Sequence, residues 1–157
     1  MTASLDGTVD LLEAMAFKAT SSTGHEITLD ASSEVGGTER GPRPIELLLL
    51  GLGGCTGMDV ISILRKMRQD VTGYQVRLHG DRADDHPKVF TAITVEHVVR
   101  GRNLSLDAVK RAVELSATRY CPAAAMLGKS AKVEESYRMI DEESGAEVTG
   151  SLALAAV

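Results

Sequence analysis

Alternating apolar and polar positions predict β-strands in several parts of the chain. These strands are expected over residues 14–20, 26–31, 73–82, 89–100 and 132–140. The first two flank a Ser-Thr-Gly turn, so we expect them to pair as a hairpin. The pattern assigns no element to residues 1–13, and the apolar ending of residues 141–157 could pair with a sheet edge or with a partner chain.

Helical spacing marks three other segments, of which the first is long and apolar. Residues 45–64 follow Pro44, which suits the first turn of a helix. The segment is as long as the roughly 20 residues of a membrane span, but Glu46 and Asp59 lie inside it. Because an unpaired interior aspartate is costly in a bilayer, we expect a buried helix of the core instead.

Two shorter helices follow the second pair of strands. Ser105 is expected to cap the first of them, whose apolar stripe includes Val109 and Val113. The second covers residues 123–128 and precedes the closing strand. This order of strands and helices predicts an α+β fold, with helices packed on antiparallel sheet.

The composition fits one soluble globular domain. The 157 residues are 43% hydrophobic and 25% charged, which allows a packed core and a single domain over residues 1–157. The net charge of −5 and the absence of Trp argue against a nucleic-acid partner, because basic and aromatic surface groups are scarce. Residues 1–10 are polar and lack the basic start of a secretory signal, so we expect a cytoplasmic protein without a membrane partner.

The two cysteines lie in different local settings. Cys55 falls in the apolar helix between Gly53 and Gly57, which either serve close packing or leave room for a small molecule to reach the sulfur. Cys121 directly precedes Pro122, so we expect it at the N-cap of the short helix. Unpaired N–H groups and the positive helix end at that position favour a thiolate.

Two thiols on neighbouring helices of a cytoplasmic domain indicate redox chemistry more than a structural disulfide. Burial of both as packing residues is the simpler alternative. Zinc is disfavoured, because the chain has neither a CxxC motif nor closely spaced histidines. His79 and His97 fall on predicted strands, where we expect outward-facing side chains. No metal or other cofactor is expected.

The stretches around both cysteines resemble motifs of the OsmC/Ohr family, which comprises osmotically inducible protein C and the organic hydroperoxide resistance proteins. Residues 44–49 (PIELLL) with 52–56 (LGGCT) are similar to the first cysteine motif, and residues 121–127 (CPAAAML) to the second. The similarity runs over residues 14–140 and looks closest to the YhfA-like subgroup.

The resemblance implies an OsmC-like fold, with antiparallel sheets around a long central helix in an intertwined homodimer. Gly53 and Gly57 would let the two central helices approach closely. Cys55 would be the peroxidatic thiolate, which attacks an organic hydroperoxide and becomes a sulfenic acid. Cys121 would resolve it as a disulfide, which an external dithiol would reduce. This chemistry needs no metal, haem or flavin.

The charged groups around Cys55 depart from the family pattern. Family members supply an Arg and a Glu, but Ile45 stands at the Glu position and Glu46 is the nearest acid. On a continuous helix Glu46 would point away from Cys55, unless the helix breaks at its glycines. Its alternatives are a capping or first-turn role and a salt bridge. Arg40, then Arg43, are the candidate cations.

Asp59 lies one turn after Cys55 and is expected on the same face, where a bare carboxylate would raise the thiol pKa unless a cation such as Arg82 neutralises it. Three hypotheses follow: a hydroperoxide reductase, a non-catalytic small-molecule-binding or redox-sensing dimer, and a protein with inert cysteines.

Overall fold

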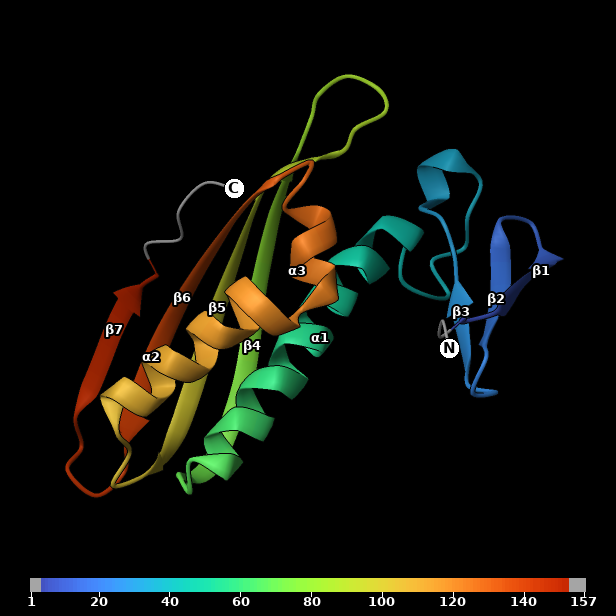
Figure 1. The fold of residues 1–157 in the computed structure, drawn as a ribbon. Coiled ribbons are helices and arrows are strands. Elements are labelled where there is room, and N and C mark those ends of the chain that lie inside the picture. Colours follow the sequence, from blue (N-terminus) through green and yellow to red (C-terminus); the bar gives the residue numbers. More distant parts are fainter. Residues whose placement is uncertain (1–3, 153–157) are drawn as a thin grey trace. The chain divides into compact units, whose positions relative to one another are not determined.

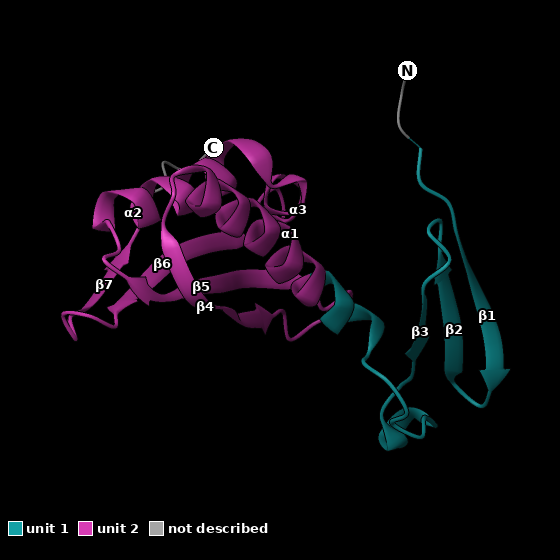
Figure 2. Cartoon of the chain, turned by 90° about the horizontal axis from the view of Figure 1, so that it is seen from below, with its two compact units in different colours: residues 1–48 teal, residues 49–157 magenta. Residues whose placement is uncertain are grey.

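A computed structural model describes residues 4–152 (Figure 1). The chain divides into two compact units, residues 1–48 and 49–157, and each is described by itself (Figure 2). Helix α1 (Pro44–Lys66) begins in the first unit and continues into the second. That residues 1–157 act as one domain stays a prediction.

The first unit is a three-stranded antiparallel sheet. It contains β1 (Gly7–Glu13), β2 (Ala16–Ser21) and β3 (Glu26–Leu29), in that spatial order, followed by a short 3₁₀ turn, η1 (Ser33–Val35). The β2–β3 hairpin confirms the prediction from alternation. Strand β1 was not predicted, although Val9 and Leu11 alternate with polar neighbours in it, and all of its residues are exposed.

The second unit carries a four-stranded sheet with helices on one face (Figure 1). After α1 its elements are β4 (Asp70–Arg82), β5 (Phe90–Arg102), α2 (Leu106–Leu115), η2 (Ser116–Tyr120), α3 (Pro122–Leu127), β6 (Lys132–Asp141) and β7 (Glu147–Ser151). The strands lie in the order β4-β5-β6-β7. The predicted strands, the long helix and the Ser105 cap of α2 are all confirmed.

Strand pairing corrects the expectation of a purely antiparallel sheet. Strands β5 and β6 are parallel, whereas the other two pairs are antiparallel. A parallel pair needs a crossover connection of a dozen or more residues, and the segment from α2 to α3 supplies it. Strand β7 occupies part of the unassigned C-terminal segment and pairs with β6 at the sheet edge, while residues 153–157 lie outside the described part of the chain.

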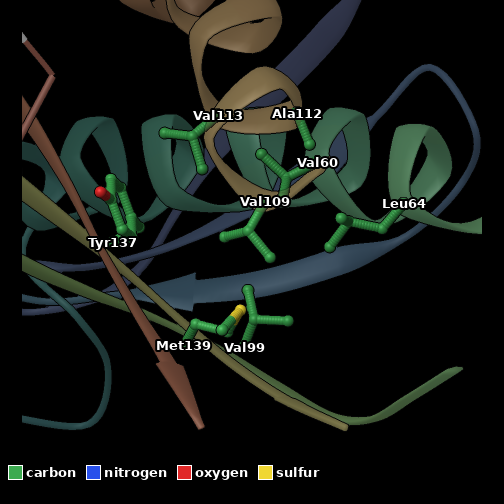
Figure 3. Packing of buried hydrophobic residues seen from close by; sticks show 8 residues of the cluster. All are labelled: Val60, Leu64, Val99, Val109, Ala112, Val113, Tyr137 and Met139. Carbon is green, nitrogen blue, oxygen red and sulfur yellow. The ribbon is translucent and has the colours of Figure 1, made fainter. Parts of the chain in front are cut away.

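The hydrophobic core of this unit lies between the sheet and two helices (Figure 3). Its buried members come from α1, α2, β5 and β6: Val60, Leu64, Val99, Val109, Ala112, Val113, Tyr137 and Met139. Alternate residues of β5 and β6 face this core, since side chains on a strand point to opposite faces in turn. The same alternation decides which polar side chains of these strands are buried.

Length and composition would allow α1 to cross a membrane, with a mean hydropathy of 1.9 over its most apolar window. The helix has a core side, where Leu52, Val60 and Leu64 are completely buried, although only 28% of that window is buried within the chain. The expectation of a core helix therefore holds for one side of α1, and its other side is exposed.

Two glycines of α1 are packed against strand β4. A Cβ atom on Gly53 would lie 2.5 Å from Leu78 Cδ1, and one on Gly57 would lie 3.3 Å from Val76 Cγ2. These glycines therefore bring the helix close to the sheet, and not to a second helix as the family resemblance implied. Gly54, in contrast, has nothing within 4 Å of a Cβ position.

Candidate active site

The structure brings the two cysteines together. Cys55 lies half-buried on α1, and Cys121 lies buried at the N-cap of α3, where its sulfur accepts the N–H of Ala124 at 3.4 Å. Both thiols are free, and Cys55 is close enough to influence the pKa of Cys121 through a hydrogen bond and through its charge. The predicted N-cap position of Cys121 is confirmed.

The thiolate predicted for Cys121 is wrong. Burial raises its pKa to about 11, and the hydrogen bond with Cys55 acts in the same direction. The backbone N–H groups of Ala123 and Ala124 lower the pKa, as expected at a helix start, but desolvation outweighs them. Cys121 is therefore a neutral thiol near pH 7, and the partly exposed Cys55 is the more accessible of the two.

Beside the thiols lies a cluster of polar side chains that the sequence analysis did not predict as a unit. Ser116 Oγ lies 2.8 Å from Thr56 Oγ1 and 3.1 Å from Asp59 Oδ2, and both hydroxyl residues are completely buried. We call Thr56, Asp59 and Ser116 the Ser116 cluster. Its signal in the sequence is the position of Ser116, which continues the buried stripe of Val109 and Val113 on α2.

Asp59 lies on the predicted side of α1, toward the segment that carries Cys121. Its partner is the Ser116 hydroxyl and not Arg82, whose Nε donates to the carbonyl oxygen of Lys88. Ser116 opens the π-helical turn η2, and its carbonyl oxygen accepts the backbone N–H of Cys121 at 3.0 Å. Such wide turns occur often at functional sites.

Arg40 belongs to the first unit, in a loop that is organised by a buried carboxylate. Asp30 accepts the backbone N–H groups of Ala31, Thr38 and Arg40, together with the Thr38 hydroxyl. The bond from Arg40 is the largest cause that lowers the Asp30 pKa to about 2. The Arg40 guanidinium lies 3.8 Å from Glu13 and is half exposed. Its role at Cys55 stays a prediction.

Glu46 has the capping role that the sequence left open. Its carboxylate accepts the backbone N–H of Arg43 at 2.9 Å and lies 3.6 Å from the Arg43 guanidinium. This is the third helical residue reaching back to the N-cap, half of a capping box. Helix α1 runs through its glycines without a break. It therefore has no irregular turn that would rotate the Glu46 side chain toward Cys55. A catalytic role for Glu46 stays a prediction.

A second polar cluster lies on the sheet and corrects the expected orientation of His97. The imidazole is completely buried, with Nδ1 2.6 Å from the Tyr74 hydroxyl and Nε2 2.7 Å from Glu135 Oε2. Tyr74, His97 and Glu135 are called the His97 cluster below. The signal for this burial is the strand period, because His97 shares a face with Val95 and Val99. His79 is exposed, as expected.

Among residues 4–152, no group of three or more His, Cys, Asp or Glu side chains could hold a metal ion. A cavity of about 380 Å³ lies within the second unit, beside Asp59. Its other lining residues are Ser62, Ile63, Lys66, Met67, Leu115 and Tyr120. Tyr120 directly precedes Cys121, so the cavity adjoins the cysteine-bearing segment.

Comparison with known proteins identifies the family. The model of the OsmC-like protein family matches residues 36–136. Protein YhfA of Escherichia coli (strain K12) is 40% identical over 132 residues, which cover 84% of this chain and 96% of YhfA. That match spans most of both chains.

Solved structures share the fold. A hypothetical protein from Aquifex aeolicus has a TM-score of 0.79 at 32% identity, covering 90% of this chain and 99% of that one. An organic hydroperoxide resistance protein from Legionella pneumophila has a TM-score of 0.63 at 13% identity, covering 87% and 98%. The family match, the YhfA identity and the shared fold agree: this chain belongs to the OsmC-like protein family.

Proposed function

We propose that this protein is a thiol-dependent peroxidase that reduces organic hydroperoxides in oxidative-stress defence. The observation that carries the proposal is the adjacency of Cys55 and Cys121, one partly exposed and the other buried and protonated. A two-cysteine peroxidase uses such an accessible sulfur beside a second thiol that can resolve it. The family supports the class of oxidant, since a Legionella protein of the same fold is named an organic hydroperoxide resistance protein.

In the proposed cycle the Cys55 thiolate attacks the O–O bond of a hydroperoxide. The sulfur gains one oxygen and becomes a sulfenic acid, and the alkoxide leaves and takes a proton to become an alcohol. The Cys121 thiol then attacks this sulfur, releasing water and forming the disulfide. An external dithiol supplies two electrons and two protons, which restores both thiols and leaves the dithiol oxidised.

We include a homodimer and a cytoplasmic location in the proposal. The side of α1 away from the core exposes Leu50 and Met58, which are 55% and 74% exposed. A second copy of the chain is the partner proposed for this side of α1, because large exposed apolar side chains are often covered in protein–protein interfaces. A cytoplasmic location suits the cycle, since thiol reductants are maintained there.

The test is a turnover assay on the reduced protein with cumene hydroperoxide as oxidant and dithiothreitol as reductant. We expect hydroperoxide consumption in the wild type and none in Cys55→Ser. Cys121→Ser is the matched control, in which the first oxidation still occurs and dimedone labels a sulfenic acid on Cys55. Turnover that survives Cys55→Ser, or no turnover in the wild type, would refute the enzyme assignment.

The alternative is a non-catalytic binding or redox-sensing dimer. The cavity beside Asp59 favours it, because about 380 Å³ is within the size range of small-molecule pockets. In that case the Cys55–Cys121 disulfide forms once, stays oxidised in the presence of dithiothreitol for many minutes, and no catalytic consumption of hydroperoxide accompanies it. The same assay therefore separates the two functions.

A further inference from the structure

Ser116 connects the two segments that carry the cysteines. Its side chain contacts Thr56 and Asp59 on the helix of Cys55, and its carbonyl oxygen accepts the N–H of Cys121. We propose that the Ser116 cluster is the positioning device that holds Cys121 beside Cys55, and that it thereby sets how readily the two thiols form a disulfide. The inference rests on the disulfide of the proposed function, but not on a hydroperoxide as its oxidant.

The chemistry of the three side chains fixes the direction of each hydrogen bond. An ionised carboxylate can only accept, so Ser116 donates its single hydroxyl proton to Asp59. The Ser116 oxygen must then accept from the Thr56 hydroxyl, 2.8 Å away. The Thr56 carbonyl oxygen, 3.5 Å from Ser116 Oγ, is a second and more distant acceptor for the same Ser116 proton, and it also belongs to α1. A cluster of this kind holds two segments in one relative position at little cost of burial.

The Ser116 cluster links the two cysteines through only a few covalent bonds and hydrogen bonds. Thr56 follows Cys55 directly in α1, and Ser116 binds both the Thr56 hydroxyl and the Cys121 amide. The hydrogen bond from the Cys121 N–H to the Ser116 carbonyl oxygen spans five residues and closes the π-helical turn just before α3 begins. Two thiols held in this way react as if their concentration were very high, because little freedom is left to lose.

The first test measures the disulfide without any hydroperoxide. Wild type and Ser116→Ala are equilibrated in glutathione buffers of stepped composition, and the thiols are trapped by acid and alkylation for mass spectrometry. Oxidised glutathione takes up two electrons and two protons as Cys55 and Cys121 join, and leaves as two reduced molecules. We expect Ser116→Ala to lower the equilibrium constant for the disulfide about tenfold, which corresponds to about 30 mV.

A matched control is available in Ser130→Ala. This serine lies just beyond α3, is exposed, and donates its hydroxyl to the Leu127 carbonyl oxygen. It tests the loss of a hydroxyl near Cys121 that does not reach α1. We expect its disulfide equilibrium to equal that of the wild type.

A second pair of variants covers the case in which Ser116→Ala does not fold. Thr56→Val keeps the shape of the side chain but removes the hydroxyl, whereas Thr56→Ser keeps the hydroxyl. We expect the disulfide equilibrium to fall severalfold in the first and to stay near wild type in the second. Asp59→Asn retains an oxygen acceptor for Ser116, so we expect a smaller effect than that of Ser116→Ala.

The outcomes separate positioning from stability and from the proposed function. If Ser116→Ala and Thr56→Val lower the free energy of unfolding of the reduced protein but leave the glutathione equilibrium unchanged, the inference is overturned. A wild type that forms no disulfide in glutathione also overturns it. If the variants behave as expected but no protein consumes cumene hydroperoxide, the peroxidase proposal fails and the inference stands.

Discussion

Helix α1 contacts two buried polar clusters that differ in what they bury. Thr56 and Asp59 belong to the Ser116 cluster on the side of η2, whereas Gly57 lies against Tyr74 of the His97 cluster on the sheet. The first consists of two buried hydroxyls and a half-buried carboxylate, and both hydroxyls have partners. The second buries an imidazole and a carboxylate completely, and Oε1 of Glu135 has no hydrogen-bond partner among residues 4–152.

The difference shows what each cluster is suited to do. Burying hydroxyl groups costs little free energy once they are hydrogen-bonded. The Ser116 cluster can therefore hold α1 and η2 in a fixed relative position at a small desolvation cost. Burying an imidazole and a carboxylate costs much desolvation free energy. Removing only one of the two leaves the other buried without a partner. Burial, together with the charges of Glu135 and Asp59, raises the pKa of Tyr74 above its ordinary range, so its phenol stays neutral beside His97.

The largest effect is expected when only one side chain of the His97–Glu135 pair is removed. His97→Leu removes the partner of Glu135 Oε2 and leaves a buried carboxylate alone, so we expect the free energy of unfolding to fall by about 3–5 kcal/mol. The double variant with Glu135→Leu replaces both groups by apolar ones and should recover most of that loss. Urea unfolding of the reduced proteins at pH 7 measures both values. Equal losses in the single and double variants would contradict a cost that comes from the unpaired carboxylate.

The next effect concerns Cys121, beside the Ser116 cluster. Its pKa rises from 9.0 to about 11, so its thiolate fraction at pH 8 should be about a hundredfold below that of an unshifted thiol. Because the folded pKa is the higher one, the stabilising contribution of this thiol is complete below pH 9 and is lost as the pH rises toward 11. Timed alkylation with iodoacetamide, followed by peptide mass mapping, should label Cys55 first at pH 8. Equal rates at the two sulfurs would contradict the burial of Cys121.

Local patterns predicted most of the elements and half of the site. Alternation gave strands β2 to β6 but not β1 or β7, and the Cys-Pro dipeptide gave the N-cap position of Cys121, because both signals depend on neighbouring residues alone. The ionisation of Cys121 was predicted wrongly, since the helix end favours a thiolate and only the fold reveals the burial that outweighs it. The parallel pairing of β5 and β6 also depends on contacts between distant residues.

The two polar clusters escaped prediction for a related reason. Residues 133, 135, 137 and 139 alternate as one face of the closing strand, so the face of Glu135 was readable, but its pairing with His97 depends on the register of two strands. In the same way the stripe on α2 predicts that Ser116 is buried but not that Thr56 and Asp59 meet it. Sequence periodicity assigns a side chain to a face and leaves its partner undetermined.

A smaller loss is expected from the Ser116 cluster. Ser116→Ala leaves the Thr56 hydroxyl buried without its acceptor and removes a donor from Asp59, so we expect the free energy of unfolding to fall by about 1–3 kcal/mol. The value should stay below that of His97→Leu, because no charge is left isolated in the interior. Urea unfolding in dithiothreitol provides the comparison, with Ser130→Ala as control. A loss equal to or above that of His97→Leu would erase the distinction between the two clusters.

The smallest expected effect compares the two sides of α1: the closed side, which packs on β4, and the open side, which is exposed. Gly53→Ala and Gly51→Ala gain the same helix propensity, but only the first places a Cβ within 2.5 Å of Leu78, whereas the second has nothing within 4 Å. The crowding can be relieved by movement of the leucine side chain, so we expect Gly53→Ala to be less stable than Gly51→Ala by about 1 kcal/mol. Chemical unfolding at several protein concentrations measures this difference. The reverse order would mean that a second chain packs on the open side of α1 more tightly than β4 packs on the closed side.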